Sequence, residues 1–195
     1  MSLQHAVLGF LKYGAFTGYD LKRLFEASVR HFWSAQQSQI YQTLADLERR
    51  GWASVELVRQ DDRPNRKEYS ITAAGREELR TWLIQPRAEP PIRSPFLVQL
   101  FFSGELGDED VLAVLEEKAE ELRGVLVLLE SGTVAQPAYA KGMPHREQFF
   151  WYLTLDYGIE SARATLAWLE IAIQKIRARA YDKGLEGAFT RRKTP

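Results

Sequence analysis

Two short stretches of helical apolar spacing open the chain. The first runs from Leu3 to Leu11, and its pattern stops at Gly14. The second begins with Thr17-Gly18-Tyr19-Asp20, where the threonine hydroxyl and the aspartate carboxylate can satisfy free N–H groups of a first helical turn. Its inward stripe is predicted to be Leu21, Leu24, Phe25, Ser28 and Phe32. The pattern therefore predicts two short helices in succession.

A third helical stretch follows a short turn near Trp33 and extends to about Arg50. Ser34 with Gln37 is expected to cap its first turn, and Gly51 stands where a helix-ending residue is expected. The helical spacing turns three apolar residues inward: Ile40, Leu44 and Leu47. The opposite face is polar without being strongly charged, and it carries Ser38, Gln42, Ala45 and Arg49 with Gln39 and Asp46 beside them.

Two stretches then alternate between apolar and polar residues, which is the pattern of half-buried strands. Ala53, Val55 and Leu57 alternate with Ser54 and Glu56, and Tyr69 and Ile71 alternate with Glu68 and Ser70. The segment that joins them, Asp61-Asp62-Arg63-Pro64-Asn65-Arg66-Lys67, combines turn-forming residues with three cations. We therefore predict a β-hairpin with an exposed, basic tip.

The region after the hairpin divides the chain. Thr72 is expected to open a helix that carries Leu79, Trp82 and Leu83. Four prolines then interrupt regular structure between Gln85 and Pro95. We predict a first domain over residues 1–85, a proline-rich linker over 86–95, a helical domain over 96–182 and a flexible tail over 183–195.

Two long helices are expected to make up most of the second domain, after an aromatic segment from Phe96 to Phe102. Asp108, Glu109 and Asp110 suit the start of the first helix, where negative charge meets the positive end of the helix dipole. Steps of three and four residues then form the seam of a coiled coil, with Leu112, Leu115, Ala119, Leu122, Leu126 and Leu129. After a loop rich in Gly and Pro, the last helix repeats the seam with Leu155, Ile159, Ala162, Leu166, Leu169, Ile173 and Ile176.

Three helices followed by a two-stranded hairpin is the element order of a winged helix-turn-helix, a DNA-binding domain. We therefore predict a mainly α (α+β) fold, with this domain first and a C-terminal domain of long helices packed as an antiparallel coiled coil. An α-helix fits the major groove of DNA, and a basic hairpin tip, the wing, can touch the neighbouring backbone. Gln can pair with adenine and Ser can donate or accept, so Ser38, Gln39 and Gln42 are candidates for sequence reading. Arg63, Arg66 and Lys67 are expected to hold phosphates.

Composition narrows the function without fixing it. The 195 residues carry 26 basic and 26 acidic side chains, so a DNA-binding role rests on where the charges lie and not on the net charge. The chain has no cysteine, its three histidines lack ligand spacing, and no phosphate-binding loop or nucleophile motif appears. We therefore expect no enzyme activity, no cofactor and no metal. We find no membrane span or signal peptide, and we expect a cytoplasmic protein.

Four segments of the chain resemble the PadR family of bacterial transcriptional regulators, in the branch with an AphA-like C-terminal region. They are the Leu3–Leu11 helix, the Thr17–Leu21 helix start, Ser38-Gln39-Ile40-Tyr41 with Leu44, Leu47 and Gly51, and the hairpin from Arg63 to Thr72 with Gly75. The resemblance is tight over about residues 1–84 and looser to about residue 180. It implies a DNA-binding dimer, usually a repressor, in which Tyr19 and Tyr41 lie near the DNA backbone. The full set of candidate DNA-contacting residues is Tyr19, Gln37, Ser38, Gln39, Tyr41, Gln42, Arg63, Asn65, Arg66 and Lys67.

The long helices also predict self-association. The two long helices can cover each other. Their seams together with Trp151, Tyr152 and Trp168 nevertheless present more apolar surface than one antiparallel helix pair can bury. The candidate dimer residues are Leu112, Leu115, Leu122, Leu126, Leu155, Ile159, Leu166, Leu169 and Ile173. A twofold dimer presents two reading helices to half-sites roughly 34 Å apart, so a palindromic operator in double-stranded DNA is the expected partner. The family resemblance adds a small hydrophobic or phenolic effector as an option.

The neutral net charge leaves one alternative open, a winged-helix adaptor that pairs with another protein and does not bind DNA. Replacement of Arg63, Arg66 and Lys67 by Ala separates the two functions. A DNA reader is expected to lose duplex binding, whereas an adaptor is expected to keep its partner.

Overall fold

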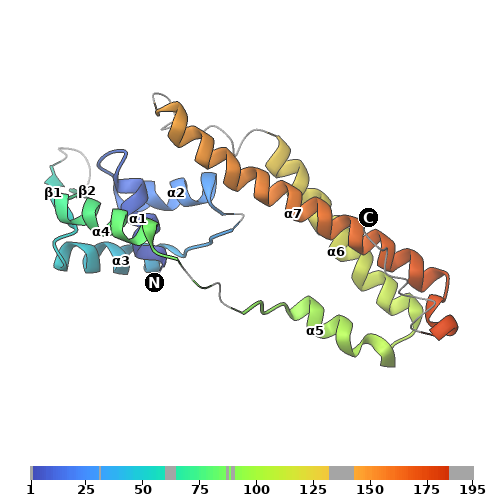
Figure 1. The fold of residues 1–195 in the computed structure, drawn as a ribbon. Helices are drawn as coiled ribbons and strands as arrows, with labels where there is room; N and C mark the ends of the chain where they lie inside the picture. Colours follow the sequence, from blue (N-terminus) through green and yellow to red (C-terminus); the bar gives the residue numbers. More distant parts are fainter. Residues whose placement is uncertain are drawn as a thin grey trace. The chain divides into compact units, whose positions relative to one another are not determined.

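The computed structural model describes residues 2–30, 32–59, 65–86, 88, 91–131 and 143–184. The chain divides into two compact units, Met1–Glu89 with Val134–Gln148 and Pro90–Thr133 with Phe149–Pro195. The first unit contains four helices and a two-stranded sheet among its described residues, and the second consists of helices (Figure 1). The predicted mainly α fold with a winged helix is confirmed.

The first unit is built on a core that three helices share. These are α1 (Ser2–Leu11), α2 (Gly18–Ser28) and α3 (Gln37–Arg49). Their inward residues are fully shielded, with Val7, Leu8, Leu21, Ile40, Leu44 and Leu47 all 0% exposed. The helix α4 (Ala73–Ile84) adds Leu79 to the same cluster. The spacing therefore identified the inward face of α3 correctly.

The start of α2 follows the predicted capping box, but its end does not follow the predicted stripe. The backbone N–H of Asp20 donates to the Thr17 hydroxyl at 3.1 Å, and the Thr17 N–H donates to the Asp20 carboxylate at 3.1 Å. The helix ends at Ser28, and the N–H groups of Phe32 and Trp33 both donate to the carbonyl of Val29. Phe32 is 49% exposed, so its predicted inward position is wrong because the helix ends before it.

The cap of α3 lies two residues later than the sequence predicted. The N-cap is Gln36, whose backbone N–H donates to Oε1 of Gln39 at 2.9 Å. The predicted cap by Ser34 with Gln37 is therefore wrong, because the Gln39 side chain satisfies this helix start instead. At the other end, Gly51 adopts a positive φ of 71°, the left-handed conformation that favours glycine after a helix.

The sheet pairs β1 (Ala53–Val58) with β2 (Arg66–Ile71) in antiparallel register, from Ala53 opposite Ile71 to Val58 opposite Arg66. Tyr69 and Ile71 are buried, as the alternation predicted. Leu57 is 56% exposed, so its predicted half-buried position is wrong. It lies opposite Lys67 near the hairpin tip, at the end of the pairing farthest from buried Ala53 and Ile71.

The second unit consists mainly of α5 (Pro95–Phe102), α6 (Asp108–Glu130) and α7 (His145–Arg177), although the first turn of α7 groups with the first unit. The two long helices confirm the sequence prediction. In contrast, α5 was not predicted, because its sequence PFLVQLFF is apolar nearly throughout and shows no helical period. Ser94 caps it by accepting the N–H of Leu97 at 3.3 Å, and Pro95 occupies the first turn.

The helices α6 and α7 lie side by side (Figure 1). Their buried contact includes Leu115, Ala119, Leu169 and Ile173, all members of the predicted seams. Exposed ion pairs join Glu116 to Arg177 at 2.6 Å, Arg123 to Glu170 at 3.4 Å and Glu130 to Arg163 at 2.7 Å. Exposed ion pairs of this kind contribute little stability. Residues later in α6 pair with residues earlier in α7, which shows that the two helices are antiparallel.

None of the described helices combines the length and the apolar character that crossing a membrane requires. The described residues also contain no group of three or more His, Cys, Asp or Glu side chains arranged to hold a metal ion.

Candidate nucleic-acid interface

The outward face of α3 is held in a defined direction by the core on its other side. Ile40 and Leu44 are 0% exposed, so the helix cannot rotate without exposing them. Ser38 and Gln42 are exposed on the opposite side. Further along the helix, Arg49 donates to Asp46 at 2.6 Å, which neutralises the charge at that end. The face therefore offers hydrogen-bonding groups with little net charge.

The two glutamines at the start of α3 differ in their surroundings. Gln37 and Gln39 are both exposed. The Oε1 atom of Gln39 accepts the Gln36 N–H, so this side chain is already engaged in the helix cap. Its amide NH2 group still has donor capacity. Of the three candidate glutamines, Gln39 is therefore the one that takes part in the cap, and among the described residues no cap bond involves Gln37 or Gln42.

The ring of Tyr41 lies against the start of α2. Gly18 is buried there, and a Cβ atom added to it would lie 2.5 Å from Cε1 of Tyr41. Tyr41 itself is 45% exposed, and Tyr19, the next residue of α2, is 59% exposed. Tyr41 is therefore partly exposed where α3 meets the start of α2, and Tyr19 is exposed one residue after the glycine that contacts it.

Tyr69 connects this surface to the sheet. Its N–H donates to the carbonyl of Phe16 at 2.9 Å and its carbonyl accepts the N–H of Phe16 at 3.0 Å, which attaches β2 to the segment before α2. Burial raises the pKa of the Tyr69 phenol, and the charges of Glu48 and Tyr41 raise it further. The phenol therefore stays protonated at neutral pH and contributes no negative charge near Tyr41.

The described part of the wing contains three of its four predicted contact residues. Arg66 forms an ion pair with Glu68 at 2.6 Å, and Lys67 is exposed. Asn65 is exposed just before β2. Arg63 lies outside the described residues. A phosphate would have to compete with Glu68 for Arg66, whereas the structure gives Lys67 no such carboxylate within the described residues.

The dimer residues predicted from the seams lie mainly inside one chain. Leu115 and Leu169 are 0% exposed, while Ile173 and Leu126 are 8% and 9% exposed. Three others pack against the same cluster: Leu112, Leu122 and Leu166. Leu155 and Ile159 are half-buried on α7. The α6–α7 pairing therefore already covers most of this set.

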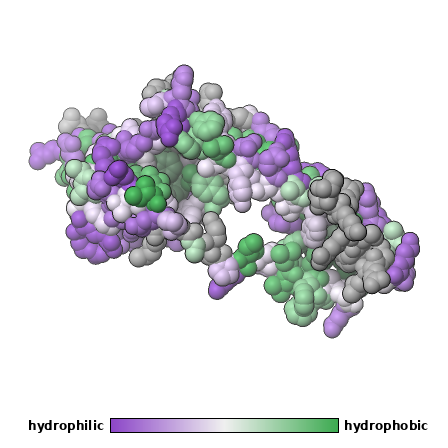
Figure 2. Space-filling view, viewed as in Figure 1, coloured by the Kyte–Doolittle hydropathy of each residue, from purple (hydrophilic) through white to green (hydrophobic). Residues whose placement is uncertain are grey.

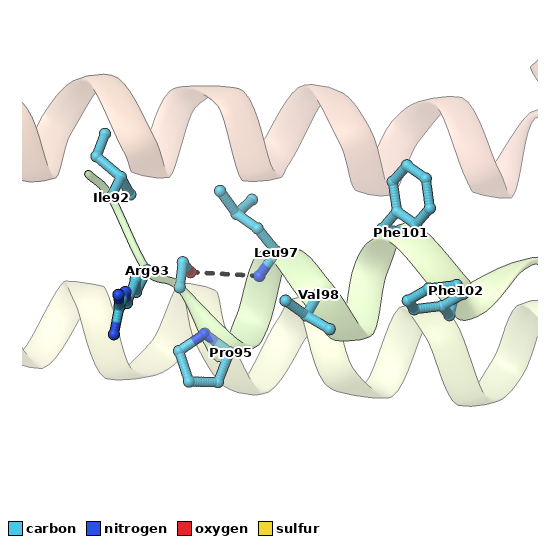
Figure 3. Close-up of a pocket in the computed structure, with 8 residues that line it drawn as sticks. Ile92, Arg93, Pro95, Leu97, Val98, Phe101 and Phe102 are labelled. Carbon is cyan, nitrogen blue, oxygen red and sulfur yellow. Dashed lines mark hydrogen bonds between the residues drawn. The ribbon is translucent and has the colours of Figure 1, made fainter.

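A large uncovered apolar surface lies on α5 (Figure 2), and exposed apolar side chains also lie on α7, among them Phe149 and Tyr157. Residues 92–102 surround a shallow, largely apolar cavity of about 690 Å³, lined by Ile92, Arg93, Ser94, Pro95, Leu97, Val98, Phe101 and Phe102. Figure 3 shows Ile92, Leu97 and Phe101 along the same side of this segment. Phe101 is 82% exposed and Phe102 is 69% exposed. We call Ile92, Leu97, Val98, Phe101 and Phe102 the α5 face.

Sequence reasoning missed two features of these surfaces, the contact of Gly18 with Tyr41 and the α5 face. A signal for the first is a glycine in the first turn of a helix that a threonine already caps. Two adjacent phenylalanines after a proline-rich segment were a signal for the second.

Family comparisons match both parts of the chain. Residues 7–81 match the Transcriptional regulator PadR-like family, and residues 92–177 match the family described as Virulence activator alpha C-term. The probable transcriptional regulator Rv1176c of Mycobacterium tuberculosis is 33% identical over 188 residues, covering 87% of this chain and 95% of the relative.

Solved structures agree with this match. PadR of Bacillus subtilis in complex with operator DNA aligns with a TM-score of 0.78 at 28% identity, over 90% of this chain and 99% of that chain. The same protein has been solved with p-coumaric acid, with a TM-score of 0.72 at 27% identity, over 91% and 99% of the two chains. The virulence activator AphA of Vibrio cholerae aligns with a TM-score of 0.70 at 30% identity, over 92% and 100%. These relatives are regulators and not enzymes, and they favour DNA binding over the adaptor alternative.

Proposed function

The chain belongs to the PadR family of DNA-binding transcriptional regulators, and on this basis we propose that it is a repressor that binds a palindromic operator as a homodimer. The operator-bound PadR of Bacillus subtilis, which aligns over 90% of this chain, supports the DNA ligand. The observation that carries the proposal is the polar outward face of α3, held in place by fully buried Ile40 and Leu44.

The base-reading residues in this proposal are Ser38 and Gln42, with Gln37 and Gln39 at the start of the same helix. Their side chains suit base edges, because a glutamine amide pairs with adenine and a serine hydroxyl can donate or accept. The hydroxyl groups of Tyr19 and Tyr41 donate hydrogen bonds to phosphate oxygens beside α3 in this proposal. Their exposed fractions of 59% and 45% support this role.

The wing supplies the electrostatic part of binding. Lys67 and Arg66 hold phosphates beside the groove, together with Asn65 and Arg63. Each neutralised phosphate releases counterions, so the affinity falls as salt rises. Because Glu68 competes for Arg66 at 2.6 Å, Lys67 is expected to contribute the larger share.

The homodimer covers the α5 face. Phe101 and Phe102 are 82% and 69% exposed, and at roughly 200 Å² for each side chain they leave roughly 300 Å² of aromatic surface in water. Ile92, Leu97 and Val98 enlarge this surface to the size at which an exposed apolar patch signals an interface. The helices α6 and α7 already bury the seam leucines against each other within one subunit. We therefore assign the contact between the two subunits to the α5 face.

The domain organisation proposed for this function is a DNA-binding domain over residues 1–85, a linker over 86–95, a dimerisation domain over 96–182 and a tail over 183–195. The two compact units divide near residue 90, which supports a boundary in this region. A small hydrophobic or phenolic effector is part of the proposal, and the p-coumaric acid complex of the Bacillus subtilis relative supports it.

Footprinting on the DNA upstream of the protein's own gene tests the proposal. We expect protection of an inverted repeat, with loss of protection in the Lys67→Ala Arg66→Ala variant. The matched control is Arg163→Ala, which removes an exposed cation from α7. Each lost phosphate contact is expected to lower the slope of log affinity against log salt by about 1. Equal affinities for the wing variant and the control would exclude the proposed role of the wing.

The base-reading role needs a different measurement. Gln42→Ala is expected to relax the preference for one base pair in each half-site. The difference in binding free energy between the preferred base pair and the others should fall by about 1–3 kcal/mol. A uniform loss across all sequences would instead make Gln42 a backbone contact. Addition of p-coumaric acid to the protein–DNA complex tests the effector, and release of the DNA is the expected result.

A further inference from the structure

Gly18 packs directly against the ring of Tyr41. An added Cβ would lie 2.5 Å from Cε1, 2.8 Å from Cζ and 2.9 Å from Cδ1 of that ring. Carbon atoms in contact are normally about 3.5–4.0 Å apart. Any residue other than glycine would therefore force the Tyr41 ring to move.

Helix formation does not explain a glycine at this position. Glycine is less stable in a helix than alanine, because it loses more backbone freedom. The cap of α2 is supplied by Thr17, whose hydroxyl accepts the N–H of Asp20 at 3.1 Å, so Gly18 is not needed as a cap. Because Gly18 has no side chain, it leaves room beside α3 for the ring of Tyr41.

The ring of Tyr41 contacts the start of α2 at Gly18, and its phenol is close enough to Tyr69 to raise the pKa of Tyr69 slightly. Tyr69 is itself attached to Phe16 by two backbone hydrogen bonds. Tyr41 nevertheless stays 45% exposed, so the contact orients the ring without covering it.

We propose that Gly18 is a positioning residue for DNA binding, which makes room for the Tyr41 ring and thereby sets the direction in which the Tyr41 hydroxyl meets a phosphate. The inference rests on the proposed function, in which Tyr41 contacts DNA. A half-exposed ring can rotate away from an added methyl group into solvent. The substitution Gly18→Ala therefore disturbs binding much more than folding.

The test compares Gly18→Ala with Gly9→Ala in the full-length protein. Gly9 is the matched control, because a Cβ added in the middle of α1 meets nothing within 4 Å. Binding is measured by fluorescence anisotropy on a labelled duplex from upstream of the protein's own gene, at low salt. We expect at least about a tenfold loss of affinity for Gly18→Ala, the size of one lost hydrogen bond to a charged group, and no loss for Gly9→Ala.

Melting temperatures and a double variant distinguish positioning from a general structural role. Gly18→Ala is expected to melt at or above the wild-type temperature. In a Tyr41→Ala background, Gly18→Ala is expected to cost no further affinity, because the ring that it displaces is already gone. If Gly18→Ala lowers the melting temperature, the added methyl group should cause no such loss in the Tyr41→Ala background, because the ring that it displaces is absent there.

Three results would overturn the proposal. They are wild-type affinity in Gly18→Ala, an unchanged loss in the Tyr41→Ala background, and a lowered melting temperature that the double variant does not regain. Failure of the proposed function is a separate result, because then the wild-type protein itself would not bind the duplex.

Discussion

The two units of this protein differ in how completely a single chain buries its apolar residues. In the first, three helices converge on residues such as Leu8, Leu21 and Leu44, all 0% exposed. In the second, α6 and α7 share a narrow seam around Leu115 and Leu169, and the α5 face stays in water. The DNA-binding unit therefore completes its core within one chain, whereas the helical unit leaves apolar surface exposed, as the proposed homodimer requires.

The largest expected effect tests the completeness of the first core. Leu44→Ala removes a fully buried side chain from α3 and is expected to lower the free energy of unfolding by about 2–5 kcal/mol. The control is Leu128→Ala on α6, which is 50% exposed and is expected to change stability by less than about 0.5 kcal/mol. Chemical denaturation monitored by circular dichroism measures both. Similar losses in the two variants would remove the contrast between the units.

The second prediction concerns the α5 face. Phe101→Ser with Phe102→Ser is expected to weaken self-association by about 2 kcal/mol or more, because exposed aromatic side chains supply much of the energy of such interfaces. Sedimentation velocity over a concentration series measures the dissociation constant. Leu83→Ser on α4, where the leucine is 66% exposed, serves as the control and should leave the oligomeric state unchanged. A double variant that associates like the wild type would show that α5 does not form the interface.

The third prediction tests the local start of α2. Thr17→Ala removes the hydroxyl that accepts the Asp20 N–H and is expected to cost about 0.5–2 kcal/mol of stability. Thr17→Ser keeps the hydroxyl and should retain most of the stability. Thermal melting of both variants measures the difference. If the serine variant were as unstable as the alanine variant, the methyl group and not the cap would carry the effect.

The smallest expected effect is a pH dependence in the first unit. A hydrogen bond from Lys12 holds the pKa of Glu147 below its usual value of 4.5, with a smaller contribution from Tyr13, although burial acts in the opposite direction. Because the folded pKa is lowered, the ionised Glu147 stabilises the fold above about pH 4.5 and this contribution is lost as the pH falls through the folded pKa. For a pair that is 37% and 30% exposed, we expect less than about 1 kcal/mol.

Melting curves of Glu147→Gln across this pH range provide the measurement. The variant should melt below the wild type at neutral pH and approach it in acid. Glu117→Gln, on an exposed position of α6, is the control. A gap between Glu147→Gln and the wild type that persists below the folded pKa would point to lost packing in place of the ion pair.

Features that depend on neighbours in the chain were predictable from the sequence alone. The capping box of Thr17 and Asp20, the helix end at Gly51 and the inward face of α3 all follow from residues within a few positions of one another. The seams of α6 and α7 were equally readable, because a repeat of three and four residues specifies one helix face. The resemblance of the same segments to the PadR family supplied the candidate tyrosines.

Only the tertiary structure decided which surfaces meet. Phe32 and Leu57 have the apolar character of core residues, yet they are 49% and 56% exposed because the helix and the sheet place them beyond the core. The match between Gly18 and Tyr41 joins residues 23 positions apart, and no local pattern encodes it. The physical reason is that helix capping and side-chain periodicity depend on residues that are close in the sequence, whereas burial depends on contacts between elements that the sequence separates.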